Sequence, residues 1–154
     1  MASISRFRSA LLVLPLVVLF ATAWRHHPAP AGPVLHVVKT PTCGCCQAWV
    51  DYMKAQGFTV TVENRADLSS FKREHGVTRD LESCHTGVVA GIVVEGHVPA
   101  DLVKKVLRDR PAGVKGIAVP GMPLGSPGME AQTSQRYTVY TFDARGNKTP
   151  YANR

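Results

Sequence analysis

The stretch VLHVVKTPTCGCCQAWV (residues 34–50) organises the rest of the chain. Its first part is apolar and rich in β-branched residues, which predicts a buried strand from Val34 to Lys39. Its second part predicts a helix from Cys43 to Gln56, with Thr42 as the N-cap and Gly57 just past the end. Three cysteines therefore lie at a turn between a strand and a helix start. Free backbone N–H groups and the helix dipole favour thiolate over thiol at such a turn.

The patterns that follow predict further strands and helices with short connections between them. We expect a strand over Phe58–Val62, a short helix over Asp67–Glu74, two strands joined around Gly91, and a helix over Ala100–Asp109. Residues 112–128 are punctuated by glycine and proline, so an irregular loop that also carries methionine is expected there. The predicted fold is therefore α/β, with a thioredoxin-like β-α-β-α-β-β-α order, this Gly/Pro/Met-rich loop and a C-terminal β-hairpin over residues 137–152.

Residues 1–23 have the features of a secretory signal peptide. Two arginines precede an apolar run that is too short to span a bilayer, and small residues follow it. We expect cleavage after Ala23 and a periplasmic protein with no stable membrane anchor. Residues 24–33 would then form a flexible mature N-terminus, and residues 34–154 a single metal-binding domain.

The charge pattern argues against a nucleic-acid partner. The formal net charge is +7, and it falls to +5 once residues 1–23, which hold two arginines and no acid, are removed. The remaining basic residues are interleaved with acids and form no long basic run. A nucleic-acid interface needs a basic stripe on one face, so we interpret this charge as a solvated surface.

The chain has four cysteines, and the fourth, Cys84, is followed directly by His85. Four cysteines in an exported protein usually form two disulfides, but adjacent Cys45 and Cys46 are hard to bridge. Cys43 and Cys46 have C-x-x-C spacing and can pair as a redox disulfide. Three clustered thiols with a distant thiol beside a histidine fit a metal site at least as well. In a thioredoxin-like fold, Cys84 would fall next to the Cys43 turn.

Four motifs resemble, in the same order, those of a known family of exported bacterial proteins. They are Pro41-Thr42-Cys43-Gly44-Cys45-Cys46, Ser83-Cys84-His85-Thr86, Glu95-Gly96-His97-Val98-Pro99 and the run from Val119 to Glu130. Over about residues 34–151 the chain is similar to the CopG-like family, a domain of unknown function (DUF family 411). The resemblance implies a thioredoxin-like fold and a role in copper and heavy-metal resistance. It also implies copper held as a redox-active cluster by Cys43, Cys45, Cys46 and Cys84.

The resemblance is the main ground for expecting Cu(I), and this soft ion prefers the thiolate and thioether ligands that the chain offers. His85 is the next candidate, either as a ligand or as a hydrogen-bond partner of one. Met122 and Met129 are weaker candidates, as soft ligands or as an apolar lid. Zinc is the alternative metal, because four such ligands can form a tetrahedral site. Trp49 and His97 are expected to have structural roles.

We therefore expect a periplasmic Cu(I)-binding protein in copper resistance or homeostasis, with a multi-copper cluster on the cysteine thiolates. Redox handling of the metal would make it a copper-linked oxidoreductase. Its expected partners are copper ions and other periplasmic copper-handling proteins. The alternative is a thiol–disulfide oxidoreductase in which Cys43 attacks and Cys46 resolves. That alternative gives Cys45 no role, and the chain has Thr86 where thioredoxin-like oxidoreductases usually have a cis-proline.

Overall fold

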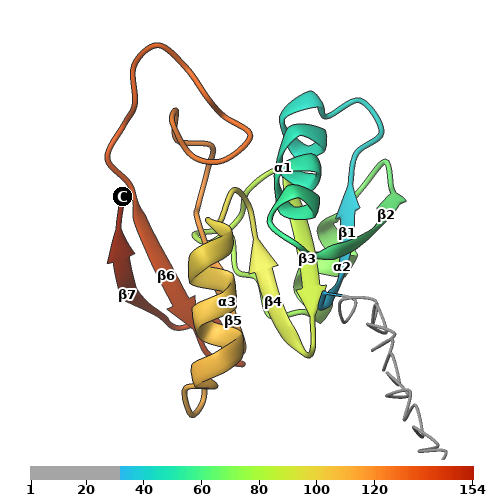
Figure 1. Cartoon of the computed structure of the whole chain (residues 1–154). Coiled ribbons are helices and arrows are strands. Elements are labelled where there is room, and N and C mark those ends of the chain that lie inside the picture. The colour runs from blue at the N-terminus through green and yellow to red at the C-terminus, as the bar shows by residue number, and fades with distance from the viewer. Residues whose placement is uncertain (1–31) are drawn as a thin grey trace, which may run out of the picture.

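The computed structural model describes residues 32–154, in which seven strands form one mixed sheet flanked by three helices (Figure 1). The predicted signal peptide and its cleavage after Ala23 lie outside these residues, as does nearly all of the predicted tail. In chain order the elements are β1 (Val34–Lys39), α1 (Gly44–Ala55), β2 (Thr59–Asn64), α2 (Ser69–Glu74), β3 (His85–Val89), β4 (Ile92–Glu95), α3 (Ala100–Asp109), β5 (Gly116–Ala118), β6 (Thr138–Phe142) and β7 (Lys148–Asn153).

The strands are ordered β2-β1-β3-β4-β5-β6-β7 across the sheet. β1 pairs in parallel with β2, as a short strand-helix-strand unit requires, and antiparallel with β3. β3 and β4 form an antiparallel hairpin around Ala90 and Gly91, both of which have positive φ. The predicted α/β class is confirmed. The order of the first four strands and the three helices is compatible with the predicted thioredoxin-like arrangement.

Helices cover both faces of the sheet, because alternate residues of its central strands point to opposite sides. Leu35 and Val37 of β1 belong to the core cluster that includes α1 and α3, whereas Val38 packs with Phe71 of α2. Figure 1 shows α1 and α3 on one face and α2 on the other. Trp49 of α1 is fully buried in the first cluster, which confirms its predicted place in the core.

The prediction of an irregular loop over residues 112–128 was wrong at one point, because Gly116–Ala118 forms strand β5. This strand runs parallel to β4 and antiparallel to β6. Gly116 is needed there: a Cβ would lie 2.6 Å from Cε1 of the Phe142 ring and 2.7 Å from the carbonyl oxygen of Val93. β5 joins the first four strands to β6 and β7, which form the predicted C-terminal hairpin.

Of the two longer helices, α3 ends at the predicted residue, whereas α1 ends at Ala55, one residue before the predicted Gln56. Gly57 follows α1 with a φ of 90°, the left-handed conformation that glycine adopts most readily after a helix. α3 spans Ala100–Asp109 as predicted, and Pro111 follows shortly after its end. Within residues 32–154, none of the helices has the length and apolar character needed to cross a membrane.

Candidate metal centre

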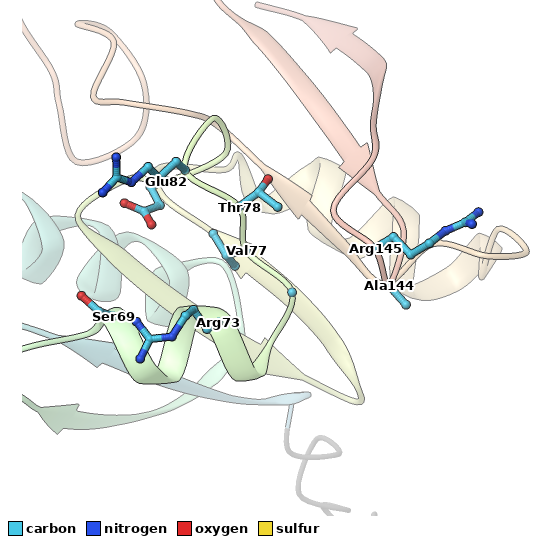
Figure 2. A pocket seen from close by; sticks show the side chains of 9 residues that line it. Ser69, Arg73, Val77, Thr78, Glu82, Ala144 and Arg145 are labelled. Carbon is cyan, nitrogen blue, oxygen red and sulfur yellow. The ribbon is translucent and has the colours of Figure 1, made fainter.

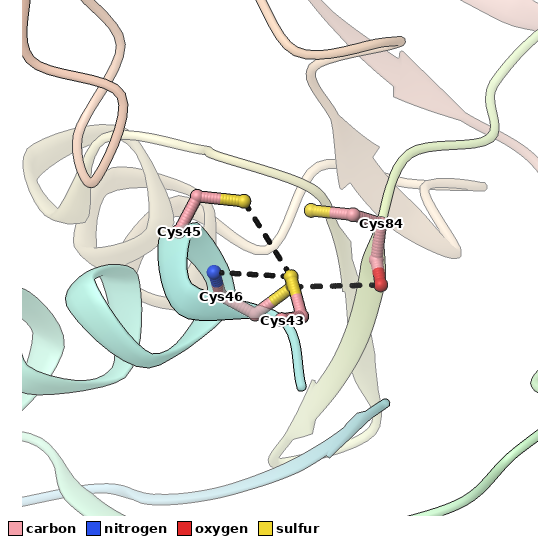
Figure 3. Close-up of side chains that lie close together, drawn as sticks. All are labelled: Cys43, Cys45, Cys46 and Cys84. Carbon is pink, nitrogen blue, oxygen red and sulfur yellow. Dashed lines mark hydrogen bonds between the residues drawn. A yellow bond between two sulfur atoms is a disulfide. The ribbon is translucent and has the colours of Figure 1, made fainter. Parts of the chain in front are cut away.

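The four cysteine sulfurs converge at the N-terminal end of α1, and all lie within 4.8 Å of one another (Figure 3). Cys45 and Cys46 are in the first turn of α1, Cys43 comes just before it, and Cys84 comes just before β3. Because β3 lies beside β1 in the sheet, the segment that enters β3 passes the turn that follows β1. The structure thus brings together all four cysteines that the sequence proposed, at the carboxyl end of a central strand.

Cys43, rather than the predicted Thr42, is the N-cap of α1. Its Sγ accepts a hydrogen bond from the backbone N–H of Cys46 at 3.3 Å. Cys43 and Cys46 are joined by a disulfide, while Cys45 and Cys84 are free and partly buried. The Cys45 Sγ lies 3.4 Å from the Cys43 Sγ, so a third sulfur is in contact with the disulfide. Reduction of that disulfide therefore yields three thiols at one helix start.

Cys84 lies between two histidines. Its Sγ is 3.4 Å from Nδ1 of His85 and 3.1 Å from Nε2 of His97. Burial, with a smaller contribution from the nearby Cys45 sulfur, raises the pKa of the Cys84 thiol to about 12. In the metal-free chain Cys84 is therefore a neutral thiol near pH 7, and a soft metal that binds it must displace its proton.

His97 presents an unprotonated nitrogen to Cys84. Its other ring nitrogen, Nδ1, lies 2.8 Å from the carbonyl oxygen of Pro127. A carbonyl oxygen can only accept, so Nδ1 carries the proton and Nε2 directs its lone pair at the Cys84 Sγ. Burial lowers the pKa of His97 and so favours the neutral ring. A neutral imidazole whose second nitrogen donates to a carbonyl is the usual form of a metal-bound histidine.

The sequence predicted a structural role for His97 and missed its contact with Cys84. The register of the β3–β4 hairpin could have predicted this contact. Counting outward from the turn at residues 90–91 pairs Thr86 with Glu95, as the structure has it. Two further steps bring Cys84 opposite His97. Together with His85 they form a second group of potential ligands, whose donor atoms also lie within 4.8 Å of one another.

His85 is fully buried against Trp49, with 4.4 Å between the ring centroids. Its Nδ1 faces the Cys84 Sγ, whereas its Nε2 has no hydrogen-bond partner within residues 32–154. The pKa of His85 lies well below its ordinary value because the ring is buried, with smaller contributions from His97 and the charge of Lys72. The ring is therefore neutral near pH 7. Its place beside Cys84 suits either predicted role, ligand or hydrogen-bond partner.

The loop between β5 and β6 carries Met122 and Met129 and packs against the start of α1. Gly128 makes the contact: a Cβ there would lie 2.7 Å from the backbone nitrogen of Trp49 and 2.9 Å from the carbonyl oxygen of Cys45. Met129 is partly buried, whereas the Met122 side chain is 51% exposed. The loop thus lies beside the cysteine turn, and the two thioether sulfurs stay predicted ligands.

A separate cavity of about 590 Å³ lies beside α2 and the loop that follows it (Figure 2). Its wall includes three arginines but no cysteine, histidine or methionine, so it offers none of the ligands that a soft metal prefers. Its lining residues are Ser69, Arg73, Gly76, Val77, Thr78, Arg79, Glu82, Ala144 and Arg145.

Comparison with solved structures gives two similar proteins, both described as the copper resistance protein CopG. Form 2 is 40% identical, with a TM-score of 0.75 over 80% of this chain and 98% of that chain. Form 1 is 41% identical, with a TM-score of 0.74 over 79% of this chain and 96% of that chain. The chain belongs to the CopG family. A family model described as a protein of unknown function, DUF411, matches residues 81–129. That range spans the second and third motifs of the predicted resemblance and all but the last residue of the fourth. The resemblance is confirmed. Among curated proteins no match was found.

Proposed function

We propose that this CopG-family chain is a periplasmic protein of copper resistance that holds Cu(I) on the thiolates of Cys43, Cys45, Cys46 and Cys84. The observation that carries the proposal is the convergence of all four sulfurs within 4.8 Å of one another. Thiolate is the ligand class that Cu(I) prefers. The two solved CopG structures, described as copper resistance proteins, support copper as the cargo. The predicted signal peptide supports the periplasmic location.

The arrangement favours several copper ions over one metal ion. Cys45 and Cys46 are adjacent in the chain, and neighbouring thiolates can each bridge two Cu(I) ions. Zinc, the alternative, would bind as a single ion to all four thiolates in a closed tetrahedral site. His97 joins the proposed ligand set, because its Nε2 lone pair is directed at the Cys84 Sγ. His85, Met122 and Met129 complete the set as additional donors.

The Cys43–Cys46 disulfide supports redox handling of the metal. In the proposed step each of two thiolates gives one electron to a Cu(II) ion, and a sulfur–sulfur bond forms between them. Two Cu(II) ions thereby become two Cu(I) ions, and no proton is needed once the thiols are ionised. Cys45 and Cys84, which are free beside the disulfide, can keep soft ligands on the Cu(I) product. The reverse step takes one electron from each of two Cu(I) ions, breaks the sulfur–sulfur bond and restores the two thiolates.

A second candidate is a thiol–disulfide oxidoreductase without metal. The disulfide joins a partly exposed residue, Cys43, to a fully buried one, Cys46. This is the arrangement of an attacking and a resolving thiol at a helix start. The candidate leaves Cys45 unexplained, although its sulfur touches the disulfide.

The test is a titration of the reduced chain with Cu(I), without oxygen and against a competing chelator, in which bound copper and protected thiols are counted together. We expect two or more copper ions per chain with all four thiols protected, and loss of most copper in Cys45→Ser. A parallel zinc titration that gives tighter binding of one ion would replace copper by zinc. If no metal binds tightly while Cys43 and Cys46 exchange with a glutathione buffer, the oxidoreductase is the function. In that case Cys45→Ser should leave the exchange unchanged.

A further inference from the structure

A buried ion pair contacts the residues that flank Cys84 and His85, and it takes no part in the proposed ligand set. It joins Lys72 of α2 to Glu95 of β4, whose side chains are 8% and 0% exposed. In every other ion pair within residues 32–154, both side chains are at least 33% exposed. A buried charge pair contributes little to stability against an apolar pair of the same size, so its placement calls for another explanation.

The Glu95 carboxylate holds the chain on both sides of Cys84 and His85. Its Oε1 accepts a hydrogen bond from the backbone N–H of Ser83 at 2.6 Å. Its Oε2 accepts one from the Thr86 hydroxyl, also at 2.6 Å. One side chain thus fixes both ends of the segment that carries the fourth cysteine.

Lys72 of α2 completes this network by contacting both Glu95 and Thr86. Its ammonium group donates to Glu95 and, at 3.0 Å, to the Thr86 hydroxyl. The Thr86 hydroxyl therefore accepts from Lys72 while it donates to Glu95, and no polar group in the network is left without a partner. Such a fully bonded set is rigid, because each bond lies in a low-dielectric interior that gives it no competing water.

The same strand end also supplies the contact to the Cys84 sulfur. His97 follows Glu95 by two residues and lies 3.1 Å from the Cys84 Sγ. Between them Gly96 packs so closely that a Cβ would lie 2.5 Å from the Cβ of Ser83. The segment is therefore held through its backbone, through the Thr86 hydroxyl and through the cysteine sulfur.

We propose that Glu95, acting through the Thr86 hydroxyl that it shares with Lys72, is the positioning residue that holds Cys84 within reach of the three cysteines of the α1 turn. Cys84 is the only one of the four cysteines that does not come from that turn. Its distance to the other sulfurs depends on the 83–86 segment keeping its place. This inference rests on the proposed function for its copper readout, while the geometry it invokes also holds in the metal-free chain.

The test uses Thr86→Val, which removes the hydroxyl without leaving a buried charge unpaired. Thr141→Val is the matched control, because Thr141 is also buried but lies on β6, away from the cysteines. Loss of a side chain that orients a metal ligand typically lowers affinity by about 10- to 100-fold. We expect a loss of that size in Cu(I) affinity for Thr86→Val, little change for Thr141→Val, and recovery in Thr86→Ser, which restores the hydroxyl.

A second readout needs no copper. With Cys43→Ser and Cys46→Ser, the only thiols left are Cys45 and Cys84. Their rate of disulfide formation under a mild oxidant then reports how often the two sulfurs meet. We expect Thr86→Val to slow this reaction by about 10-fold, in line with its effect on a bound metal, and Thr141→Val to leave it unchanged.

The two readouts separate this inference from the proposed function. If the parent chain binds no copper but Thr86→Val slows the disulfide, the proposed function fails and the positioning role stands. If Thr86→Val changes neither readout, or if Thr141→Val changes both equally, the positioning role is wrong whatever the parent chain binds. Loss of copper affinity in Thr86→Ser equal to that in Thr86→Val would also overturn it, since the hydroxyl would then be irrelevant.

Discussion

Gly128→Ala should separate the Met-bearing loop from the cysteine turn. Gly128 has a φ of 81°, in the left-handed region that a residue with a Cβ enters only with strain. The added Cβ would lie 2.7 Å from the Trp49 nitrogen and 2.9 Å from the Cys45 carbonyl oxygen. Both atoms belong to the backbone of α1, so no side-chain rotation can relieve the contact. Either α1 or the loop must move.

The loss of stability in Gly128→Ala has two sources, the backbone strain and the close contact with α1. The left-handed conformation costs about 1–2 kcal/mol for a residue with a Cβ. Overpacking against a rigid neighbour costs a further ~1–3 kcal/mol. The free energy of unfolding should therefore fall by about 2–5 kcal/mol, which at ~4 °C per kcal/mol lowers Tm by roughly 8–20 °C. If the loop lifts away instead, the loss of stability is smaller. Pro127 then moves with the loop, and its carbonyl no longer holds the His97 ring at 2.8 Å.

The control is Gly113→Ala, which has the same backbone strain without the contact. Gly113 has a φ of 76°, and nothing lies within 4 Å of the position its Cβ would take. It should lose only the ~1–2 kcal/mol of strain and no copper affinity. The assays are urea denaturation of the metal-free chain and Cu(I) competition against a chelator. Equal stability and equal copper affinity in the two variants would refute the claim that Gly128 seats the loop on α1.

Two more predictions concern pH and processing. The pKa values of both His85 and His97 are lowered by burial, so below about pH 6.5 the unfolded chain binds protons that the folded chain does not. Stability of the metal-free chain should therefore fall as pH drops below 6.5, by up to ~1.4 kcal/mol per pH unit for each histidine. Burial raises the pKa of Glu95, which acts in the opposite sense, so the test is whether His97→Asn has a shallower slope than the parent chain. For processing, N-terminal sequencing of the exported protein should begin at Trp24, and retention of Met1 would contradict the signal peptide.

Local signals predicted most of the elements that build the site. β1 and α3 have the bounds that their apolar patterns indicated, because one is a run of β-branched residues and the other an amphipathic stripe that ends before Pro111. The convergence of Cys84 on the Cys43 turn also followed from the order of elements. It depends on β3 lying beside β1, which is what the predicted thioredoxin-like order implies and what the structure has.

Strand β5 escaped prediction because its determinants are not local. Gly116–Ala118 has only three residues and lies in a run dense with glycine and proline, which by itself indicates a loop. What makes it a strand is the gap between β4 and β6, where Gly116 alone leaves room for the Phe142 ring. The Cys43–Cys46 disulfide could not be predicted from spacing alone either. The spacing of the cysteines was consistent both with this pair and with a four-thiol metal site.

The β3–β4 hairpin determines the positions of both His97 and Glu95 relative to Cys84. Its two-residue turn sets a register in which Glu95 faces Thr86 and, two steps further, His97 faces Cys84. Residues two apart in a strand share a face. Here, however, Glu95 is the last residue of β4 and His97 lies beyond it, and the chain bends between them at Gly96, which has a φ of 72°. That bend lets Glu95 accept a hydrogen bond from the backbone of Ser83 while His97 contacts the Cys84 sulfur. A change in the length of the turn would shift the register and uncouple both at once, which makes the hairpin, as much as the cysteine turn, the element that defines the site.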